Sequence, residues 1–112
     1  MRLGKLSALV SIMPGVMVAA PAHDDVDTDF SNQLHGYGIY GQRDYNAWLA
    51  KITCKRLGDG LDISAEKSAV FLSHNLPRGT DTAQTWQFLA AAIDTYGPEL
   101  TPMLTAVSEP NR

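Results

Sequence analysis

The sequence of 112 residues has a single cysteine, Cys54, and few basic residues. One cysteine excludes a disulfide framework and a thiolate zinc site within one chain. The 9 lysines and arginines are outnumbered by 12 aspartates and glutamates, which gives a net charge of −3. Nucleic-acid-binding proteins usually have the opposite balance, so no nucleic-acid partner is expected.

Motifs of catalysis are missing as well. The chain has no GxSxG elbow, no P-loop and no HExxH pair of histidines. Residues 25–29 resemble the start of a calcium loop, but Phe30 stands where such a loop needs glycine. No constellation joins a nucleophile, a base and an orienting group, so we predict that the protein is not an enzyme.

Residues 1–22 have the pattern of a secretory signal peptide. Arg2 and Lys5 supply a positive start, and the next 17 residues, up to Ala22, carry no charge. The ending Ala-Pro-Ala fits the small-x-small cleavage pattern. The alternative is a membrane anchor, but this run is broken by Pro14 and is short for a span of about 20 apolar residues. We therefore predict export with cleavage after Ala22 and no stable membrane anchor afterwards.

Cleavage at this point leaves 90 residues and takes the net charge from −3 to −5. The mature protein is then a small acidic domain that is secreted, either extracellular or in the cell envelope. We divide it into an acidic flexible leader (23–28), a helical domain (29–107) and a C-terminal tail (108–112).

The spacing of apolar residues predicts an all-α fold, a small bundle of four to five short helices. The first helix begins near Thr28 or Asp29, either of which can cap it. Phe30, Leu34 and Tyr37 share one face of this helix. No stretch alternates with period two for long enough to predict a strand.

The second helix is the most clearly marked, with Asp44 as its N-cap and Gly58 as its stop. It has a large apolar face and a smaller one roughly opposite, formed respectively by Tyr45, Trp48, Leu49 and Ile52, and by Ala47, Ala50, Cys54 and Leu57. A helix that is apolar on two sides is usually packed on two sides, so we place it near the centre of the bundle. Trp48 and Trp86 are accordingly predicted to be core aromatics.

Three more segments complete the bundle. A third helix is predicted over about 62–75, and a fourth from Thr80 or Asp81 to Tyr96. Residues 98–107 are predicted to form one more short, weak helix with proline in its first turn.

Basic residues cluster on the second helix, at Lys51, Lys55 and Arg56. In an otherwise acidic domain, such a cluster more often forms ion pairs than binds phosphate. We therefore predict ion pairing for these three side chains.

Cys54 leaves three interpretations open. It lies near the end of the second helix, where the helix dipole disfavours a thiolate. A buried structural thiol is therefore the favoured interpretation. An intermolecular disulfide, which would give a dimer through Cys54, and a reactive thiol are the alternatives.

Four residues could ligate haem iron, because tyrosinate and imidazole both bind it. They are Tyr37, Tyr40, His35 and His74. The alternative interpretation of each histidine is an ordinary surface or helix-capping residue. Apart from haem, no cofactor and no metal are expected.

Three stretches resemble a mycobacterial exported family, the domain of unknown function numbered 732. They are RDYNAWLAKITCKRL at 43–57, NLPRGT at 75–80 and TWQFLAAAI at 85–93. The resemblance covers about residues 29–104. It implies a small all-helical secreted domain, and these motifs carry no known chemistry.

The resemblance also implies a disulfide that this chain lacks. The family usually has one cysteine at the position of Cys54 and a second in a Tyr-Cys-Pro motif. Here that motif reads Tyr96-Gly97-Pro98. Such a bond would join the second helix to the end of the fourth, and closing a loop of roughly 40 residues is worth about 3–4 kcal/mol. We therefore expect a less stable domain than its relatives, with Cys54 unpaired within the chain.

These observations favour a non-enzymatic binding or interaction protein, with envelope proteins as its partners. The alternative is a carrier of a small ligand, specifically haem, by analogy with a small exported haem-carrying protein of mycobacteria. A carrier needs an apolar pocket with a few convergent polar groups, whereas an interaction protein needs an exposed apolar patch.

Overall fold

A computed structural model describes residues 23–107, so the predicted signal peptide and C-terminal tail lie outside the described residues. The described chain consists of helices joined by turns, and it contains no strand. In order, the helices are α1 (His23–Gly36), α2 (Arg43–Gly58), α3 (Ala65–Ser73), α4 (Thr82–Tyr96), the 3-10 helix η2 (Pro98–Leu100) and α5 (Thr101–Val107). The all-α prediction is confirmed.

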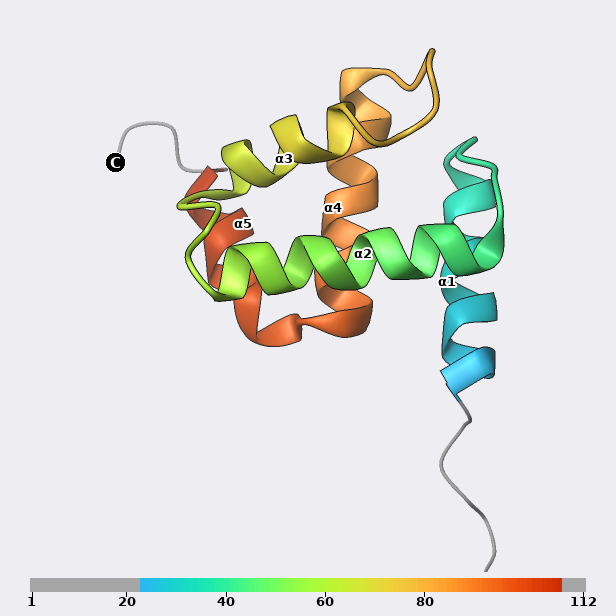
Figure 1. The fold of residues 1–112 in the computed structure, drawn as a ribbon, viewed down its shortest axis with the longest axis horizontal. Helices are drawn as coiled ribbons and strands as arrows, with labels where there is room; N and C mark the ends of the chain where they lie inside the picture. Colours follow the sequence, from blue (N-terminus) through green and yellow to red (C-terminus); the bar gives the residue numbers. More distant parts are fainter. Residues whose placement is uncertain (1–22, 108–112) are drawn as a thin grey trace, which may run out of the picture.

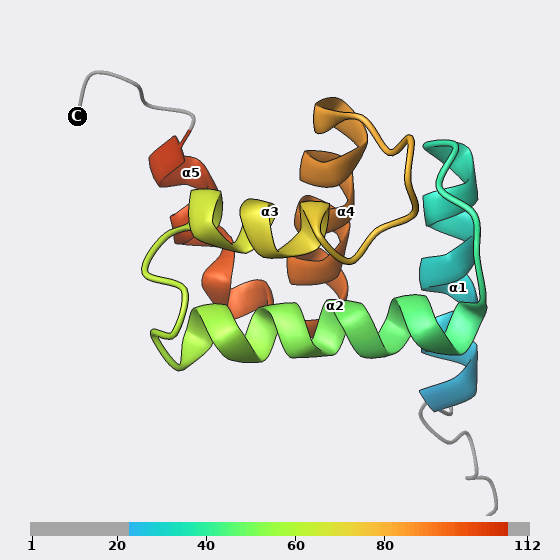
Figure 2. The ribbon, with the colours of Figure 1, turned by 45° about the horizontal axis from the view of Figure 1, so that its top comes forward.

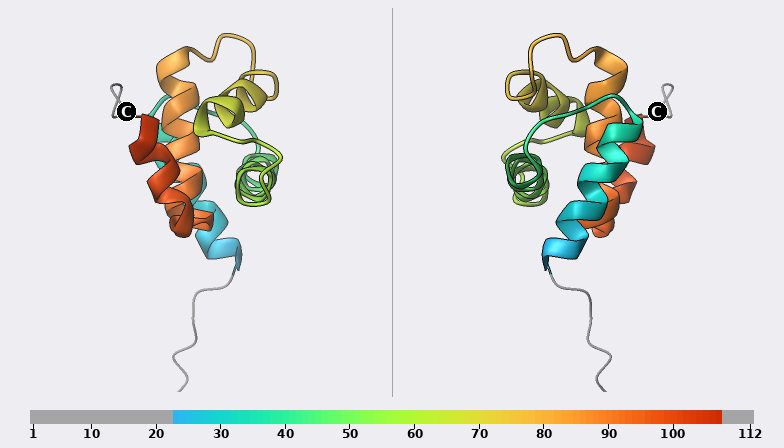
Figure 3. Two further views of the ribbon diagram at one scale, coloured as in Figure 1. Left: turned by 90° about the vertical axis from the view of Figure 1, so that its left-hand side faces the viewer. Right: turned by 90° about the vertical axis from the view of Figure 1, so that its right-hand side faces the viewer.

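The helices form two layers (Figure 1). Seen from either side, α1, α4 and α5 lie in one layer, and α2 and α3 lie in the other (Figure 3). Helix α2 crosses the first layer, with α1 at its N-terminal end and α4 near its middle (Figures 1 and 2). Helix α4 packs against every other helix of the described chain, so it shares the centre with α2.

The core lies where the two layers meet. Phe30 and Leu34 from α1 are fully buried, as their spacing predicts. The Phe30 ring meets Phe88 of α4 edge to face, with the ring centroids 5.5 Å apart. Leu49 of α2 and Leu72 of α3 fill the space between these layers. None of the described helices is long and apolar enough to cross a membrane.

Local capping sets the start of two helices. The Ser64 side chain accepts a hydrogen bond from the Lys67 amide at the start of α3. Asp81 and Gln84 form a capping box at the start of α4, so of the two predicted starts, Thr80 and Asp81, the second is the cap. The Gln84 side-chain amide also donates to the Tyr37 carbonyl, which attaches the loop after α1 to α4.

Helix α1 begins earlier than its sequence indicates. It starts at His23, so residues 23–28, which we expected to form a flexible leader, are helical. The reason is a long-range contact. Asp27 accepts a hydrogen bond from Tyr96 and pairs with Lys51, so this turn is held against α4 and α2.

Helix α3 is shorter than predicted. It begins at Ala65 rather than at Asp62, and Asp62 is instead buried before the helix. There the Asp62 carboxylate accepts two hydrogen bonds from Arg56 and one from the Ser68 hydroxyl. Three polar interactions with this buried carboxylate outweigh the helical propensity of residues 62–64.

Helix α2 differs from its prediction in two ways. Its N-cap is Gln42 rather than Asp44. The smaller apolar face, which includes Ala47 and Ala50, is the buried one, because small residues allow close approach of α4. On the larger face only Leu49 is buried, and Trp48 is 52% exposed. The prediction that Trp48 is a core residue is therefore wrong, whereas Trp86 is half-buried and packs against the core.

Candidate functional site

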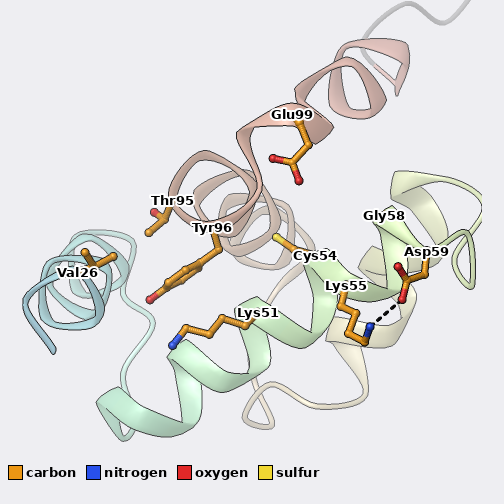
Figure 4. Close-up of a pocket in the computed structure, with 9 residues that line it drawn as sticks. All are labelled: Val26, Lys51, Cys54, Lys55, Gly58, Asp59, Thr95, Tyr96 and Glu99. Carbon is orange, nitrogen blue, oxygen red and sulfur yellow. Dashed lines mark hydrogen bonds and ion pairs between the residues drawn. The ribbon is translucent and has the colours of Figure 1, made fainter. Parts of the chain in front are cut away.

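Two hollows lie beside α2, one on each side of a ridge formed by Lys55 and Asp59, which line both hollows. The first, which we call the Trp48 hollow, has a volume of about 340 Å³ and is lined by Trp48, Ile52, Lys55, Arg56, Asp59, Leu61 and Phe71. The second, which we call the Tyr96 groove, is a larger space of about 750 Å³ (Figure 4). It is lined by Val26, Lys51, Cys54, Lys55, Gly58, Asp59, Thr95, Tyr96 and Glu99.

Part of the rim of the Trp48 hollow is apolar and exposed. Leu61 is 67% exposed, so this residue and the indole of Trp48 both present apolar surface to solvent. The Tyr45 ring lies 5.8 Å from the Trp48 ring. The Tyr45 hydroxyl donates to the Asn75 carbonyl at 2.9 Å, which fixes the ring between α2 and the end of α3.

The floor of the Trp48 hollow is held in place by Arg56. Its guanidinium lies 4.0 Å from the centre of the Phe71 ring, a cation–π contact. The same group donates two hydrogen bonds of 3.0 Å to the buried Asp62 carboxylate. These contacts hold the Arg56 side chain between Phe71 and Asp62 at the floor of the hollow.

In the Tyr96 groove, a hydrogen bond and an ion pair to one carboxylate join three helices. The Tyr96 hydroxyl of α4 donates a 2.6 Å hydrogen bond to Asp27 of α1. The Lys51 ammonium of α2 lies 3.4 Å from the same carboxylate and 5.3 Å from the centre of the Tyr96 ring. Figure 4 shows Lys51 extended toward the hydroxyl end of Tyr96.

This contact shifts the pKa of two groups in opposite directions. Burial raises the pKa of Asp27, but the Tyr96 hydrogen bond and the Lys51 charge outweigh it, so the pKa falls below its ordinary value of 3.8. Burial and the neighbouring Asp27 raise the pKa of the Tyr96 phenol well above its ordinary value of 10.0. Tyr96 therefore stays a hydrogen-bond donor, and Asp27 stays an acceptor, across the neutral range.

Cys54 lies at the inner side of this groove. It is 8% exposed, and its thiol donates a 3.4 Å hydrogen bond to the Ala92 carbonyl. Burial, with a further contribution from the charge of Glu99, raises the pKa of the thiol to about 11. A thiol that stays protonated and buried is a poor nucleophile, which agrees with the favoured interpretation of a structural cysteine.

Cys54 and Gly97 are direct neighbours. A Cβ atom placed on Gly97 would lie 3.3 Å from the Cys54 Cβ and 3.2 Å from its Sγ. Cβ atoms joined by a disulfide are typically about 3.5–4.5 Å apart. The end of α4 therefore approaches α2 where the family resemblance implies the second cysteine.

The four candidate haem ligands lie outside both hollows. The structure brings two of them together, since the His35 and Tyr40 rings are 5.2 Å apart on the exposed surface. The Tyr37 hydroxyl accepts a hydrogen bond from Gln33. His74 is the exposed C-cap of α3, in the other layer of the fold. Among the described residues, no group of three or more His, Cys, Asp or Glu side chains is placed to hold a metal ion.

The predicted ion pairs of the α2 cluster are confirmed. Lys51 pairs with Asp27, Lys55 with Asp59 at 3.0 Å, and Arg56 with Asp62. The sequence alone does not reveal which acidic residue each cation meets. Asp27 and Tyr96 are separated by 69 positions, and no local sequence pattern connects them. The sequence alone therefore does not predict the Tyr96 groove.

The helices and the two hollows define a small all-helical domain with an exposed aromatic surface. The chain belongs to the family described as a protein of unknown function (DUF732), whose model matches residues 24–99. It is similar to two uncharacterized proteins of Mycobacterium tuberculosis, from strains CDC 1551 / Oshkosh and ATCC 25618 / H37Rv. Each is 57% identical over 97 residues, which cover 85% of this chain and 87% of the relative. No solved structure matches the chain.

Proposed function

We propose that this protein is an exported, non-enzymatic binding domain of the cell envelope that recognises a partner protein. The contact surface is the Trp48 surface, formed by Tyr45, Trp48, Ile52, Leu61 and Phe71. A single observation carries the proposal: Trp48, one of the chain's two tryptophans, is 52% exposed at the edge of a largely apolar hollow. The leader pattern of residues 1–22 supports export.

The chemistry of this surface is that of an interface centre. Tryptophan, tyrosine and arginine are the residues most enriched among those that dominate binding energy. Here Trp48 and Tyr45 are exposed neighbours, and Arg56, which is held by Asp62, lines the same hollow as Trp48. Contiguous exposed apolar patches that are rimmed by polar residues mark protein–protein interaction sites.

The hollow indicates what the partner presents. Its volume of about 340 Å³ and its lining by Trp48, Leu61 and Phe71 fit one bulky apolar side chain. Both side chains of the Lys55–Asp59 ion pair on its rim are exposed. The pair therefore contributes only about 0.3–0.5 kcal/mol to stability, and either side chain can form an ion pair with a binding partner instead. We therefore expect a protein segment with an apolar anchor residue and polar flanks.

Site-specific crosslinking tests this proposal. A photo-crosslinking amino acid is placed at position 48 of the full chain in a mycobacterial host, with the exposed position Gln87 on α4 as the control. We expect one envelope protein to be crosslinked from position 48 and not from position 87. The purified partner should then bind the Trp48→Ala variant at least about tenfold more weakly. Equal crosslinking from both positions would overturn the proposal, and crosslinks to a second copy would show self-association instead.

Haem carriage is the second candidate, and the pairing of the His35 and Tyr40 rings favours it. Haemin titration of the full chain, followed by the Soret band, tests it. A saturating one-to-one shift that is weakened in His35→Ala would support haem binding. His74→Ala would show whether His74 is a second ligand. A shift no larger than that of a nonspecific control protein would remove this candidate.

A further inference from the structure

The Tyr96 groove lies on the other side of the α2 ridge from the Trp48 surface, and the proposed function does not use it. Four elements form its walls: α1, α2, the end of α4, and η2. Its volume of about 750 Å³ is in the usual range of small-molecule sites, about 300–1,000 Å³. The charges and the apolar surfaces of these walls indicate what such a site would hold.

The cations of the groove are already neutralised. The Lys51 ammonium lies beside Asp27, whose carboxylate is itself held by the Tyr96 hydroxyl. The Lys55 ammonium forms a 3.0 Å ion pair with Asp59. An anionic ligand would therefore have to displace the half-buried Asp27 carboxylate from Lys51, or the exposed and more easily displaced Asp59 carboxylate from Lys55.

Of the two acidic residues that line the groove, Asp59 is paired with Lys55, and Glu99 is the other. It lies in η2, and its side chain is drawn on the side of the groove opposite Lys51 and Lys55 (Figure 4). Among the described residues, no cation forms an ion pair with it. The wall beside it is the C-terminal end of α4, at Thr95 and Tyr96, where the helix dipole adds further negative potential.

The remaining lining is apolar or uncharged. Val26 of α1, Gly58 of α2 and the ring of Tyr96 border the space, and the Cys54 thiol is protonated at neutral pH. A ligand that meets Glu99 with a positive charge would therefore place its other end against apolar surface.

We propose that the Tyr96 groove binds a monovalent organic cation with an apolar body, whose ammonium group pairs with Glu99 while its body packs against Tyr96 and Val26. The proposal does not depend on the Trp48 surface or on the identity of a protein partner.

Three matched probes test the charge preference on the full chain. They are 2-phenylethylammonium, the neutral 2-phenylethanol and the anionic 3-phenylpropanoate, and binding is followed by amide chemical shifts in NMR. We expect saturable shifts of the Thr95, Tyr96 and Glu99 amides with the ammonium probe. The neutral probe should bind about fivefold more weakly, which is the upper end of the contribution of an ion pair with an exposed side chain such as Glu99. Equal or tighter binding of 3-phenylpropanoate would overturn the proposal.

Variants test the position of the site. Glu99→Gln should weaken ammonium binding about fivefold. Asp94→Asn, which removes the same charge from an exposed position of α4 outside the groove lining, should leave binding within about twofold. Thr95→Trp fills the groove while keeping Glu99, and it should abolish the shifts. If Glu99→Gln and Asp94→Asn bind alike, or if the probe shifts the Trp48 surface instead, the assignment to this groove is wrong.

Discussion

The Tyr96 hydroxyl donates a 2.6 Å hydrogen bond to the carboxylate of Asp27 and so joins the end of α4 to the first turns of α1. Lys51 of α2 lies beside the same carboxylate, so one acidic side chain links three helices. This link explains why residues 23–28 are ordered as a helix although their sequence is strongly acidic. It also makes the stability of the first helix depend on the end of the fourth.

Replacing Tyr96 by phenylalanine tests this link. The ring and its edge contact with Phe30 remain, but Asp27 loses a charge-assisted hydrogen bond. We expect the free energy of unfolding to fall by about 1–2 kcal/mol, measured by urea denaturation. Tyr40→Phe is the matched control because Tyr40 is an exposed tyrosine, and it should change stability by less than about 0.5 kcal/mol. Equal stability of the two variants would mean that the hydrogen bond contributes nothing.

The lowered pKa of Asp27 predicts a loss of stability in acid. In the unfolded chain the carboxyl takes up its proton near the ordinary value of 3.8, whereas in the folded protein it does so only at lower pH. The stabilisation is therefore fully present above about pH 5 and is lost as the pH falls through the folded value. Urea midpoints measured from pH 6 to pH 2 should fall less steeply in Asp27→Asn than in the parent. The control, Asp25→Asn, alters an exposed neighbour on α1 and should keep the parent's slope.

Gly97→Cys is expected to form a disulfide with Cys54. A Cβ atom at position 97 would lie close to disulfide distance from Cys54, and the φ of Gly97, −150°, lies outside the left-handed region that favours glycine. Closing this loop should stabilise the oxidised protein by up to about 3–4 kcal/mol, less the strain of displacing Leu100, whose Cδ1 would lie 3.1 Å away. Thermal melts with and without reductant measure the gain.

Two comparisons make the disulfide experiment decisive. Gly97→Ser adds a side chain of nearly the same size without a bond, so it isolates the cost of steric contact with Leu100. A thiol titration counts free cysteines after air oxidation. If Gly97→Cys keeps two titratable thiols while folded, the inferred approach of α4 to α2 is wrong.

The local features of the fold are predictable from the sequence. Asp81 caps α4 through atoms within four residues of it, and the Phe30–Leu34 spacing marks the buried face of α1 without reference to the rest of the chain. Capping and helical periodicity depend on near neighbours, so they are readable before the tertiary structure is known.

The candidate sites are less predictable because they depend on contacts between distant segments. Asp62 stands where the sequence predicts the start of a helix, yet its carboxylate accepts hydrogen bonds from Arg56 and Ser68 instead. Asp27 belongs to an acidic stretch that is typical of a solvated leader, and only the placement of Tyr96 beside it changes that interpretation. Periodicity shows that α2 has two apolar faces, but it does not show that one of them is left without a covering helix.

The two faces of α2 make a final prediction about stability. Trp48 lies on the exposed face, so Trp48→Ala should lower the free energy of unfolding by less than about 1 kcal/mol. Phe88 is fully buried against Phe30, so Phe88→Ala should cost about 3–5 kcal/mol. Urea denaturation of both variants measures the difference. A large loss in Trp48→Ala would show that the indole is part of the core, and the Trp48 surface would then not be free to bind a partner. A small loss leaves this variant folded, so that any weakening of partner binding reports the contact itself.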